Sequence, residues 1–468
     1  MHARRTLGPW LVLVVSVLLP PAAPAAPKED EPAQLVGTPA AVAIAPQDAT
    51  LLGRRATRQL IATANYADGT VRDLTRALEW VSLNPEIATV SAKGQVVPKA
   101  NGSATIVARR GSVEVKTTVK VEKMEQPAPV SFRRDVVPAL SQAGCNMGAC
   151  HGTPTGKGGF KLSLRGYLPD QDYTVLTREA GGRRITPLAA ATSIILRKPL
   201  GEVPHEGGLR LARNTKTYEF LHDWVQEGGK DDPNAPAAVK LEILPGSRVL
   251  NAPARSQQIV ALLTLGDGTV RDVTPICYYD SSNPEIASVD ADGYVSFKSR
   301  GEVAVIAHYL SLVANVRLTH LVDVPGFKLA DVPQDNVIDK AVFAKLNRMR
   351  ISPSELCTDS EYIRRVYLDT VGILPKPEDV RAFLADPSAD RRGKVVDQLL
   401  SRPEFYDFWT LKFADILRSN GRLIQPKGAY VFNRWIRAAL ERNVPMDQFV
   451  RDLLTADGSS FNNPATNY

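Results

Sequence analysis

A stretch of eight residues that occurs twice constrains the fold of this chain most strongly. Asp68–Thr75 has the sequence DGTVRDLT and Asp267–Thr274 has DGTVRDVT, so the second copy starts 267 − 68 = 199 residues after the first. Asn84–Ala88 (NPEIA) returns as Asn283–Ala287 at the same offset, 283 − 84 = 199. A fixed offset without gaps indicates two copies of one domain with a segment inserted between them.

Each copy has the pattern of a small all-β domain. Short runs of Val, Ile, Thr and Ala alternate with turn residues, as in Ser103–Ala108 and Glu302–Ala307. The Asp-Gly pairs predict hairpin turns, because glycine accepts a positive φ and aspartate bonds its own backbone. Several such strands in about 85 residues predict a Greek-key sandwich.

The order D-G-T-x-x-D-[LV]-T, then S-x-N-P-E-I-A, then a glycine-bearing turn resembles the bacterial Ig-like group 2 domain. The resemblance covers residues 40–122 and 239–322 and implies two all-β Ig-like sandwiches. Members of that family commonly serve as surface spacers or adhesion modules, so the resemblance implies such a role for these two segments.

The aspartates of the repeated motif have two interpretations. They are Asp68, Asp73, Asp267 and Asp272. Calcium binding is one interpretation, but their spacing lacks a full set of oxygen ligands. We favour turn formation and the solvation of strand ends.

The first 26 residues have the pattern of a secretory signal peptide. Arg4 and Arg5 precede a short apolar run, Leu11–Leu19, and small residues fill Pro20–Ala26. This run is too short to span a membrane, and no later segment approaches the length of a transmembrane helix. We expect cleavage after residues 1–26, export to the periplasm or cell surface, and no transmembrane segment beyond the signal peptide.

Charge and cysteine content exclude two classes of protein. The net charge of +7 is spread along 468 residues without a Lys/Arg block, so we expect no nucleic-acid partner. Four cysteines are too few for a disulfide scaffold. Cys277, in a strand-like region, and Cys357, in a helical one, are predicted to be buried thiols. A bridge between these two remains an alternative.

The segment between the two copies, residues 128–235, contains the run Gly144–Gly152 (GCNMGACHG). Cys145, Cys150 and the histidine that follows, His151, have the residue types that attach a c-type haem. In that chemistry each thiol forms a thioether with the porphyrin, and the histidine is the proximal iron ligand. Four residues separate the cysteines here instead of the usual two, which makes a wider loop. We therefore predict covalent haem c as the cofactor.

Other uses of this run stay open. In an oxidising compartment Cys145 and Cys150 could form a disulfide. A zinc site is the third alternative, although adjacent Cys150 and His151 seldom chelate one tetrahedral ion. For the sixth haem ligand we favour His205, which lies in a loop and is the tentative distal iron ligand, over His222 on a predicted helix. Met147 sits inside the attachment loop and is not expected to reach the opposite haem face.

Two helices are predicted around this run. Ser131–Leu140 leads into it, and Thr215–Glu227 has apolar residues at helical spacing. With Gly156–Gly166 and Val203–Gly208, the stretch resembles the planctomycete-type cytochrome c domain. The resemblance implies a mainly α, cytochrome c-like domain at residues 128–235.

The C-terminal region, residues 334–468, is predicted to be helical. Ile338 and Val342 share one predicted helix face. Arg364–Gly372 and Phe408–Arg418 closely resemble the planctomycete domain of unknown function 1549. Members of that family usually continue into a further domain, so we expect this chain to be a fragment.

A catalytic role for the C-terminal region is not predicted. Asp339, Asp369 and Asp415 are expected to be capping or solvated carboxylates rather than catalytic groups. Aromatic residues such as Phe405 and Trp409 are expected in the core. Whether the chain is an enzyme is left open.

The main prediction is an exported haem protein that transfers single electrons to an unknown redox partner and is displayed on Ig-like modules. The first alternative is a non-redox cell-surface adhesion or glycan-binding scaffold, whose partner is a surface polysaccharide or protein. The second alternative is a redox-linked enzyme with a pocket in residues 335–468.

Overall fold

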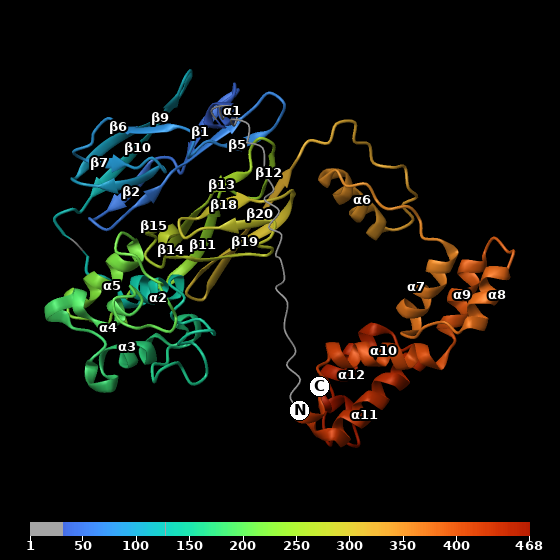
Figure 1. Ribbon diagram of the computed structural model, residues 1–468. Helices are drawn as coiled ribbons and strands as arrows, with labels where there is room; N and C mark the ends of the chain where they lie inside the picture. Colours follow the sequence, from blue (N-terminus) through green and yellow to red (C-terminus); the bar gives the residue numbers. More distant parts are fainter. Residues whose placement is uncertain (1–30, 127) are drawn as a thin grey trace, which may run out of the picture. The chain divides into compact units, whose positions relative to one another are not determined.

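The computed structural model describes residues 31–126 and 128–468. They form two compact units, one ending at Ile351 and one running from Ser352 to Tyr468 (Figure 1). The predicted signal peptide, residues 1–26, lies outside the described residues. Over the described ranges, no helix has the length and apolar character needed to cross a membrane.

The first unit opens with α1 (Glu31–Val36) and the first Ig-like domain. Its strands are β1 (Ala41–Ala45), β2 (Ala49–Leu52), β3 (Arg58–Gln59), β4 (Ile61–Asn65), β5 (Val71–Asp73), β6 (Glu79–Ser82), β7 (Ala88–Val90), β8 (Gln95–Pro98), β9 (Gly102–Arg110) and β10 (Val113–Glu122). Alternating side chains turn inward along β10, where Val119 and Val121 join Trp80 in one core.

The second Ig-like domain has the same strands in the same order. They are β11 (Ala238–Leu244), β12 (Arg248–Asn251), β13 (Ser256–Gln258), β14 (Val260–Leu265), β15 (Val270–Asp272), β16 (Tyr278–Ser281), β17 (Ala287–Val289), β18 (Tyr294–Phe297), β19 (Gly301–Tyr309) and β20 (Leu312–Leu321), with a 3-10 turn, η5 (Thr274–Ile276), before β16. The prediction of an all-β region from the repeated motif is confirmed.

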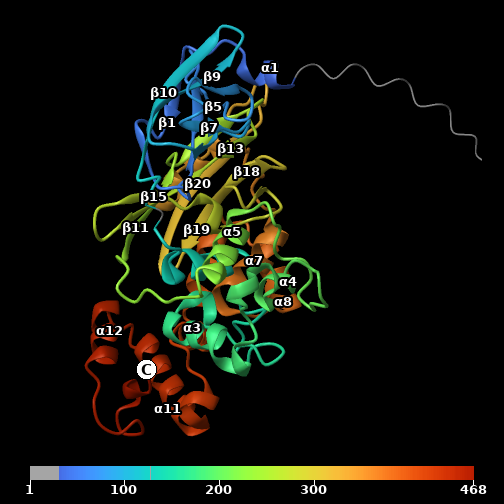
Figure 2. The same ribbon diagram turned by 90° about the vertical axis from the view of Figure 1, so that its left-hand side faces the viewer.

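The two Ig-like domains share a sheet. In the first domain the strand orders are β1-β4-β5, β2-β10-β9-β6 and β3-β8-β7, and the second domain repeats this pattern. Leu250 of β12 pairs in parallel with Val71 of β5, which joins one sheet of each domain into seven strands. Figure 2 shows the two domains side by side.

The Asp-Gly pairs form hairpin turns, as predicted. Between β4 and β5, Gly69 has φ 78°, and the Thr70 N–H donates to Asp68 Oδ1 over 2.8 Å. In the second domain the Thr269 N–H donates to Asp267 Oδ1 over 2.9 Å. These two exposed aspartates therefore act in the turn, as expected.

The Asn-Pro-Glu-Ile motif folds over a glycine. Gly102 has φ 144°, and a Cβ built on it would lie 2.8 Å from Cδ1 of Ile87. In the second domain Gly301 has φ 156° and meets Ile286 at the same 2.8 Å. In each copy the isoleucine therefore packs directly against the glycine, which leaves no room for a side chain at the glycine position.

The insert, residues 128–235, is mainly helical with long loops. Its elements are η1 (Phe132–Val136, a π turn), α2 (Val137–Gln142), η2 (Leu164–Gly166), α3 (Pro169–Thr177), η3 (Glu179–Gly182), η4 (Pro187–Thr192), α4 (Ile194–Arg197) and α5 (Lys216–Gln226). The two helices predicted from the sequence are η1 with α2 and α5. Thr215 caps α5 by accepting from the Tyr218 N–H over 3.2 Å.

The insert and the second Ig-like domain share one hydrophobic core. Phe132 and Trp224 of the insert pack with ring centroids 5.2 Å apart. The same buried cluster continues into Leu263, Ile276 and Tyr309 of the second Ig-like domain. Figure 2 shows the helices of the insert beside that domain.

A further helix, α6 (Val337–Met349), follows the second Ig-like domain within the first unit. The apolar face predicted for this helix is exposed to solvent: Ile338 is 68% exposed and Val342 is 48% exposed. Lys345 forms an ion pair with Glu302 of β19. Asp339 accepts from the Asp335 N–H over 3.0 Å, which is a capping role.

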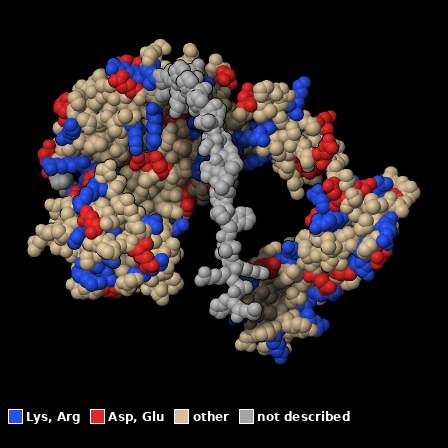
Figure 3. All heavy atoms as spheres, in the orientation of Figure 1, with Lys and Arg blue, Asp and Glu red and all other residues tan. Residues whose placement is uncertain are grey.

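The second unit is helical, as predicted. Its elements are α7 (Asp359–Val371), α8 (Pro377–Ala385), α9 (Arg391–Leu400), α10 (Pro403–Ile416), α11 (Gly421–Glu441), α12 (Met446–Leu454) and η6 (Pro464–Asn467). Thr358 and Glu361 form a capping box at the start of α7. Asp369 and Asp415 are exposed. Charged side chains of both signs are interspersed over the face drawn in Figure 3.

Candidate functional site

The loop with the two cysteines begins directly after α2. The Cys145 N–H donates to the Leu140 carbonyl and the His151 N–H to the Cys145 carbonyl, both over 2.9 Å. Both cysteines are free thiols, so the structure does not contain the disulfide between Cys145 and Cys150. Burial, with Cys150 close by, raises the pKa of the Cys145 thiol to about 12.

His151 is held through one ring nitrogen. Its Nδ1 lies 3.0 Å from the Phe160 carbonyl oxygen, and the two rings pack with centroids 4.4 Å apart. Because a carbonyl only accepts, Nδ1 carries the proton of the neutral ring, and Nε2 keeps its lone pair. Burial of the ring lowers the pKa of His151 and favours this neutral form. An anchored Nδ1–H with a free Nε2 is typical of metal-ligating histidines.

His205 lies on an exposed loop near His151. Its Nδ1 lies 2.8 Å from the Gly208 carbonyl oxygen. His222 lies on α5, where its Nδ1 contacts Asp223 Oδ1 at 3.0 Å.

The donor set around His151 fits a c-type haem in chemistry, because it offers two free thiols and a neutral imidazole whose Nε2 keeps its lone pair. A groove of about 1160 Å³ runs past Gly148 and Gly152 of the same loop, but none of the four predicted site residues lines it. Among the described residues, no group of three His, Cys, Asp or Glu side chains is placed to hold a metal ion.

The two remaining cysteines are also free thiols. Cys277 is buried in the core of the first unit, as predicted, and burial raises its pKa. Cys357 lies just before α7 and is only half-buried, so its prediction as a fully buried helical thiol is wrong.

Two aspartates of the repeated motif join the Ig-like domains to each other. Asp272 Oδ2 accepts a hydrogen bond from the Gln59 backbone N–H over 2.6 Å. Asp73 Oδ2 in turn accepts from the Gln258 backbone N–H. Since 272 − 73 = 199 and 258 − 59 = 199, the two contacts are equivalent under the repeat. We call this pair of contacts the reciprocal aspartate lock.

The expectation that Asp73 and Asp272 solvate strand ends is wrong, because both carboxylates lie in the contact between the two Ig-like domains. Asp73 is 5% exposed and Asp272 is half-buried. Burial raises the pKa of both carboxyls, while hydrogen bonds from the other domain and from Thr75 and Thr274 oppose the rise. A buried carboxylate is retained only where such bonds satisfy it, so these aspartates specify how the domains pair.

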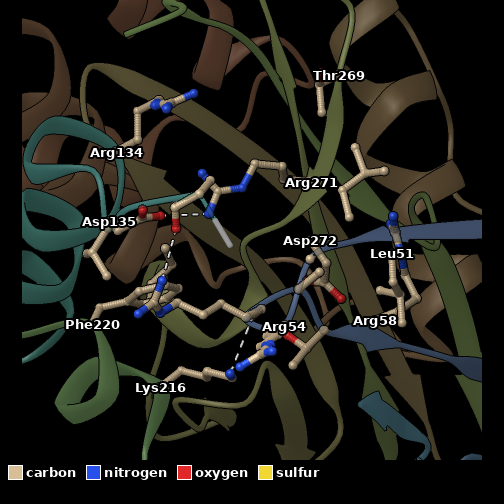
Figure 4. A pocket seen from close by; sticks show the side chains of 18 of the residues that line it. Leu51, Arg54, Arg58, Arg134, Asp135, Lys216, Phe220, Thr269, Arg271 and Asp272 are labelled. Atoms are coloured by element: carbon tan, nitrogen blue, oxygen red, sulfur yellow. Dashed lines mark hydrogen bonds and ion pairs between the residues drawn. The ribbon is translucent and has the colours of Figure 1, made fainter. Parts of the chain in front are cut away.

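The symmetry of the pair is broken on one side. The equivalents of Leu250 and Val71, which pair β12 with β5, are Leu51 and Val270 at the 199-residue offset. Among the described strands these two do not pair. Instead both line a cavity of about 230 Å³ where the two Ig-like domains and the insert meet (Figure 4). We call this cavity the three-domain pocket.

Ion pairs hold the insert against the Ig-like domains around this pocket. Arg271 Nη2 lies 2.6 Å from Asp135 Oδ1, a pair marked by a dashed line in Figure 4. The buried Asp135 raises the pKa of Arg271. Arg55 Nη2 lies 2.6 Å from Glu227 Oε1 and 3.0 Å from Asp223 Oδ2 of the insert. These contacts make the pocket a fixed junction of three domains.

Asp267 and Asp272 line this pocket and stand out in the sequence as aspartates of the repeated motif, but the motif does not indicate a pocket. One signal was available: a comparison of the two copies aligns Arg58 with Gln257, 257 − 58 = 199, next to the identical pair Gln59 and Gln258. Arg58 is charged where its equivalent Gln257 is neutral, which indicates that this position has different surroundings in the two domains.

Two segments of the chain match known families. Residues 40–121 match the bacterial Ig-like domain (group 2), and residues 337–468 match a protein family of unknown function (DUF1549). Neither match extends over the insert. The chain is thus a multidomain protein that combines a bacterial Ig-like module with a helical DUF1549 region, and the Ig-like match favours a protein located outside the cytoplasm.

Comparison with whole proteins adds a curated relative. Ice-binding protein 1 of Shewanella frigidimarina (strain NCIMB 400) is 25% identical over 267 residues, which cover 57% of this chain and 27% of that protein. The chain therefore spans about a quarter of the length of this curated relative.

Solved structures show only distant likeness. Domains 5–6 of the S-layer protein SbsC are 13% identical with a TM-score of 0.24, covering 60% of this chain and 98% of that one. Human protocadherin-24 EC1-2 is 10% identical with a TM-score of 0.15, and the match covers 61% of this chain and 100% of that one. TM-scores this low carry no argument about function.

Proposed function

We propose that this chain is an exported cell-surface adhesion protein in which the paired Ig-like domains form a rigid binding platform. The signal-peptide pattern at residues 1–26 and the group 2 Ig-like match support export and surface display. The platform presents the insert and the second unit to a surface polysaccharide or protein.

The observation that carries this proposal is the reciprocal aspartate lock. Asp73 and Asp272 each reach across the domain boundary to a backbone N–H, although 238 − 122 − 1 = 115 residues lie between the last strand of one copy and the first strand of the next. Domains that served only as flexible spacers would not need buried polar contacts between them. A fixed pair lowers the conformational entropy lost when a partner binds, which favours a binding role.

The test uses the full chain with its own leader, produced in a bacterial host. We expect intact cells to be labelled by a membrane-impermeant biotin reagent on this protein. Purified protein should sediment with isolated polysaccharide, and ice joins the ligands to be tested because the curated relative is named for binding ice. The double variant D73A/D272A should lose binding, whereas D68A/D267A, which alters the exposed turns, should retain it. Absence of surface labelling, or equal binding by both variants, contradicts the proposal.

A second candidate function is electron transfer through covalent haem, favoured by the way His151 is held. Cys145 and Cys150 would hold the group as thioethers, and His151 would ligate iron through Nε2 while Phe160 fixes its ring. His205 would be a second ligand of the iron. When bound, the group supplies one-electron chemistry.

Production with a c-type maturation system tests this candidate. We expect a pyridine haemochrome spectrum and haem staining on a denaturing gel, both lost in Cys145→Ser and Cys150→Ser. His205→Ala should keep the covalent haem and change only its ligand spectrum. Protein that matures without haem while a control cytochrome in the same cells acquires it rejects this function and leaves the adhesion proposal intact.

A further inference from the structure

The two copies of the repeat differ at one buried position beside the lock. In the second domain this position is Gln257, which is 0% exposed. Its Nε2 donates to Asp73 Oδ2 over 3.2 Å and to the Gln258 carbonyl over 2.8 Å, and its Oε1 accepts from Arg248 over 3.3 Å. Every polar atom of this side chain therefore has a partner.

The equivalent residue in the first domain, Arg58, lacks such partners. It lines the three-domain pocket and is only 5% exposed. Its Nε is buried without a hydrogen-bond partner. Asp272 is the carboxylate whose charge acts on it, and burial lowers the pKa of Arg58 nonetheless.

An arginine in this state is costly to the fold. A guanidinium carries five donors in a planar fork, and burial of the Nε–H of Arg58 without an acceptor is unfavourable. The neighbouring copy shows that glutamine fills the same position with all its hydrogen bonds made. A buried donor without an acceptor requires an explanation, and at the wall of a cavity a bound anion would supply the missing acceptors.

The lining of the pocket has the matching chemistry. Six of its residues are Lys or Arg and three are Asp. Three of the cations are held by carboxylates at 2.6–2.7 Å: Arg55, Lys216 and Arg271. Among the described residues, three lining cations form no ion pair: Arg54, Arg58 and Arg134. Arg54 Nε donates to the Met124 carbonyl over 3.1 Å and Arg134 Nε to Ser131 Oγ over 3.3 Å. Leu51, Phe220 and Ile276 add apolar wall.

We propose that the three-domain pocket binds an oxyanion, a carboxylate or a sulfate, carried by a single sugar residue of an acidic polysaccharide, with Arg58 as its bidentate partner. The polysaccharide as source of the anion rests on the proposed adhesion function. The cavity of about 230 Å³ lies below the 300–1,000 Å³ of drug-sized sites, so it admits one ring. A planar guanidinium matches both oxyanions with two parallel hydrogen bonds.

Calorimetry and thermal shift on the purified full chain test this proposal, with glucuronate, inorganic sulfate and neutral glucose as probes. We expect glucuronate and sulfate to bind and raise the melting temperature, with an affinity that falls as NaCl is added. Glucose should bind at least about tenfold more weakly, because it brings no charge to the pocket.

The variant Arg58→Gln places in the first domain the residue that the second domain already has. Its amide can donate to Asp272 as that of Gln257 donates to Asp73, so we expect an unchanged or higher melting temperature without ligand. Binding of both anions should weaken at least about tenfold. The matched control Arg109→Gln removes the same charge from an exposed position on β9 and should bind as the parent chain does.

Two results overturn the proposal: no binding of either anion by the parent chain, or equal affinities of Arg58→Gln and Arg109→Gln. If Arg58→Gln does not fold, Arg58→Lys decides, because it keeps the charge without the planar fork. Full affinity in that variant contradicts bidentate binding. Cells play no part in this experiment, so it is independent of whether surface adhesion is observed.

Discussion

Removal of the Asp73 carboxylate tests whether the reciprocal aspartate lock holds the Ig-like domains together. Asp73→Ala takes away the acceptor of two buried backbone N–H groups, those of Thr75 and Gln258, and of a side-chain N–H of Gln257. A hydrogen bond to a charged group contributes about 1.5–3 kcal/mol, and a buried N–H left unpaired costs about 1–3 kcal/mol. The desolvation cost of the carboxylate offsets part of this sum. We expect the free energy of unfolding of the first unit to fall by about 3–5 kcal/mol.

Hydrogen exchange and denaturant unfolding measure this effect. The Gln258 N–H should exchange much faster in Asp73→Ala, because its acceptor lies in the other domain. Asp68→Ala, five positions earlier in the same motif, changes only an exposed turn and should leave this exchange rate as it is. If Gln258 keeps its protection in Asp73→Ala, or if both variants unfold at the same denaturant concentration, the lock does not stabilise the pair.

Three further predictions concern pH, thiol reactivity and backbone strain. The pKa of Asp73 is raised above its ordinary value of 3.8, so the folded state favours the protonated acid, and the parent chain should lose stability relative to Asp73→Asn as the pH rises from about 4. Melting temperatures of both proteins at pH 3.5 and 7 check this. If the parent chain gains stability relative to Asp73→Asn at the higher pH, the prediction is refuted. Cys145, with its pKa at about 12, should be alkylated by iodoacetamide at pH 8 about 10³-fold more slowly than a free thiol, and tenfold faster with each added pH unit. Mass spectrometry of the Cys145 peptide follows the rate, and fast labelling at pH 8 would show an accessible thiolate. Gly102→Ala should destabilise the first unit by about 1–3 kcal/mol, through positive φ and the contact with Ile87. Gly111→Ala is the control, because Gly111 also has a positive φ (58°) but an added Cβ there meets no atom, so it measures the cost of backbone strain alone. Equal losses of thermal stability in the two variants would show that the contact with Ile87 contributes nothing.

Much of the fold could be predicted from local patterns. The Asp68-Gly69 turn is satisfied within its own hairpin, so eight residues carry the information for it. The helix capped by Thr215 is likewise a short-range feature. Ile338 and Val342 show the limit of this method, because helical spacing predicts a shared face but does not say whether another element covers it.

The lock and the pocket could not be predicted, because their contacts are long-range. Asp73 and Asp68 stand in the same motif and have the same side chain, yet one is buried by Gln258, 185 residues away, and the other faces solvent. Arg58 likewise acquires its character only when three domains meet around it.

The pairing of the Ig-like domains also acts on the insert as a covalent crosslink would. Between Glu122 of β10 and Ala238 of β11 lie 238 − 122 − 1 = 115 residues, whose two ends are fixed by the folded pair. A chain of that length loses about 4 kcal/mol of conformational freedom when its ends are held. The folded insert is therefore more stable within the chain than it would be if excised. Conversely, unfolding of the insert would destabilise the pairing of the two Ig-like domains by the same free energy. The closed loop therefore lowers the unfolded fraction of the insert, which is the form that proteases cut, as a disulfide across its two ends would.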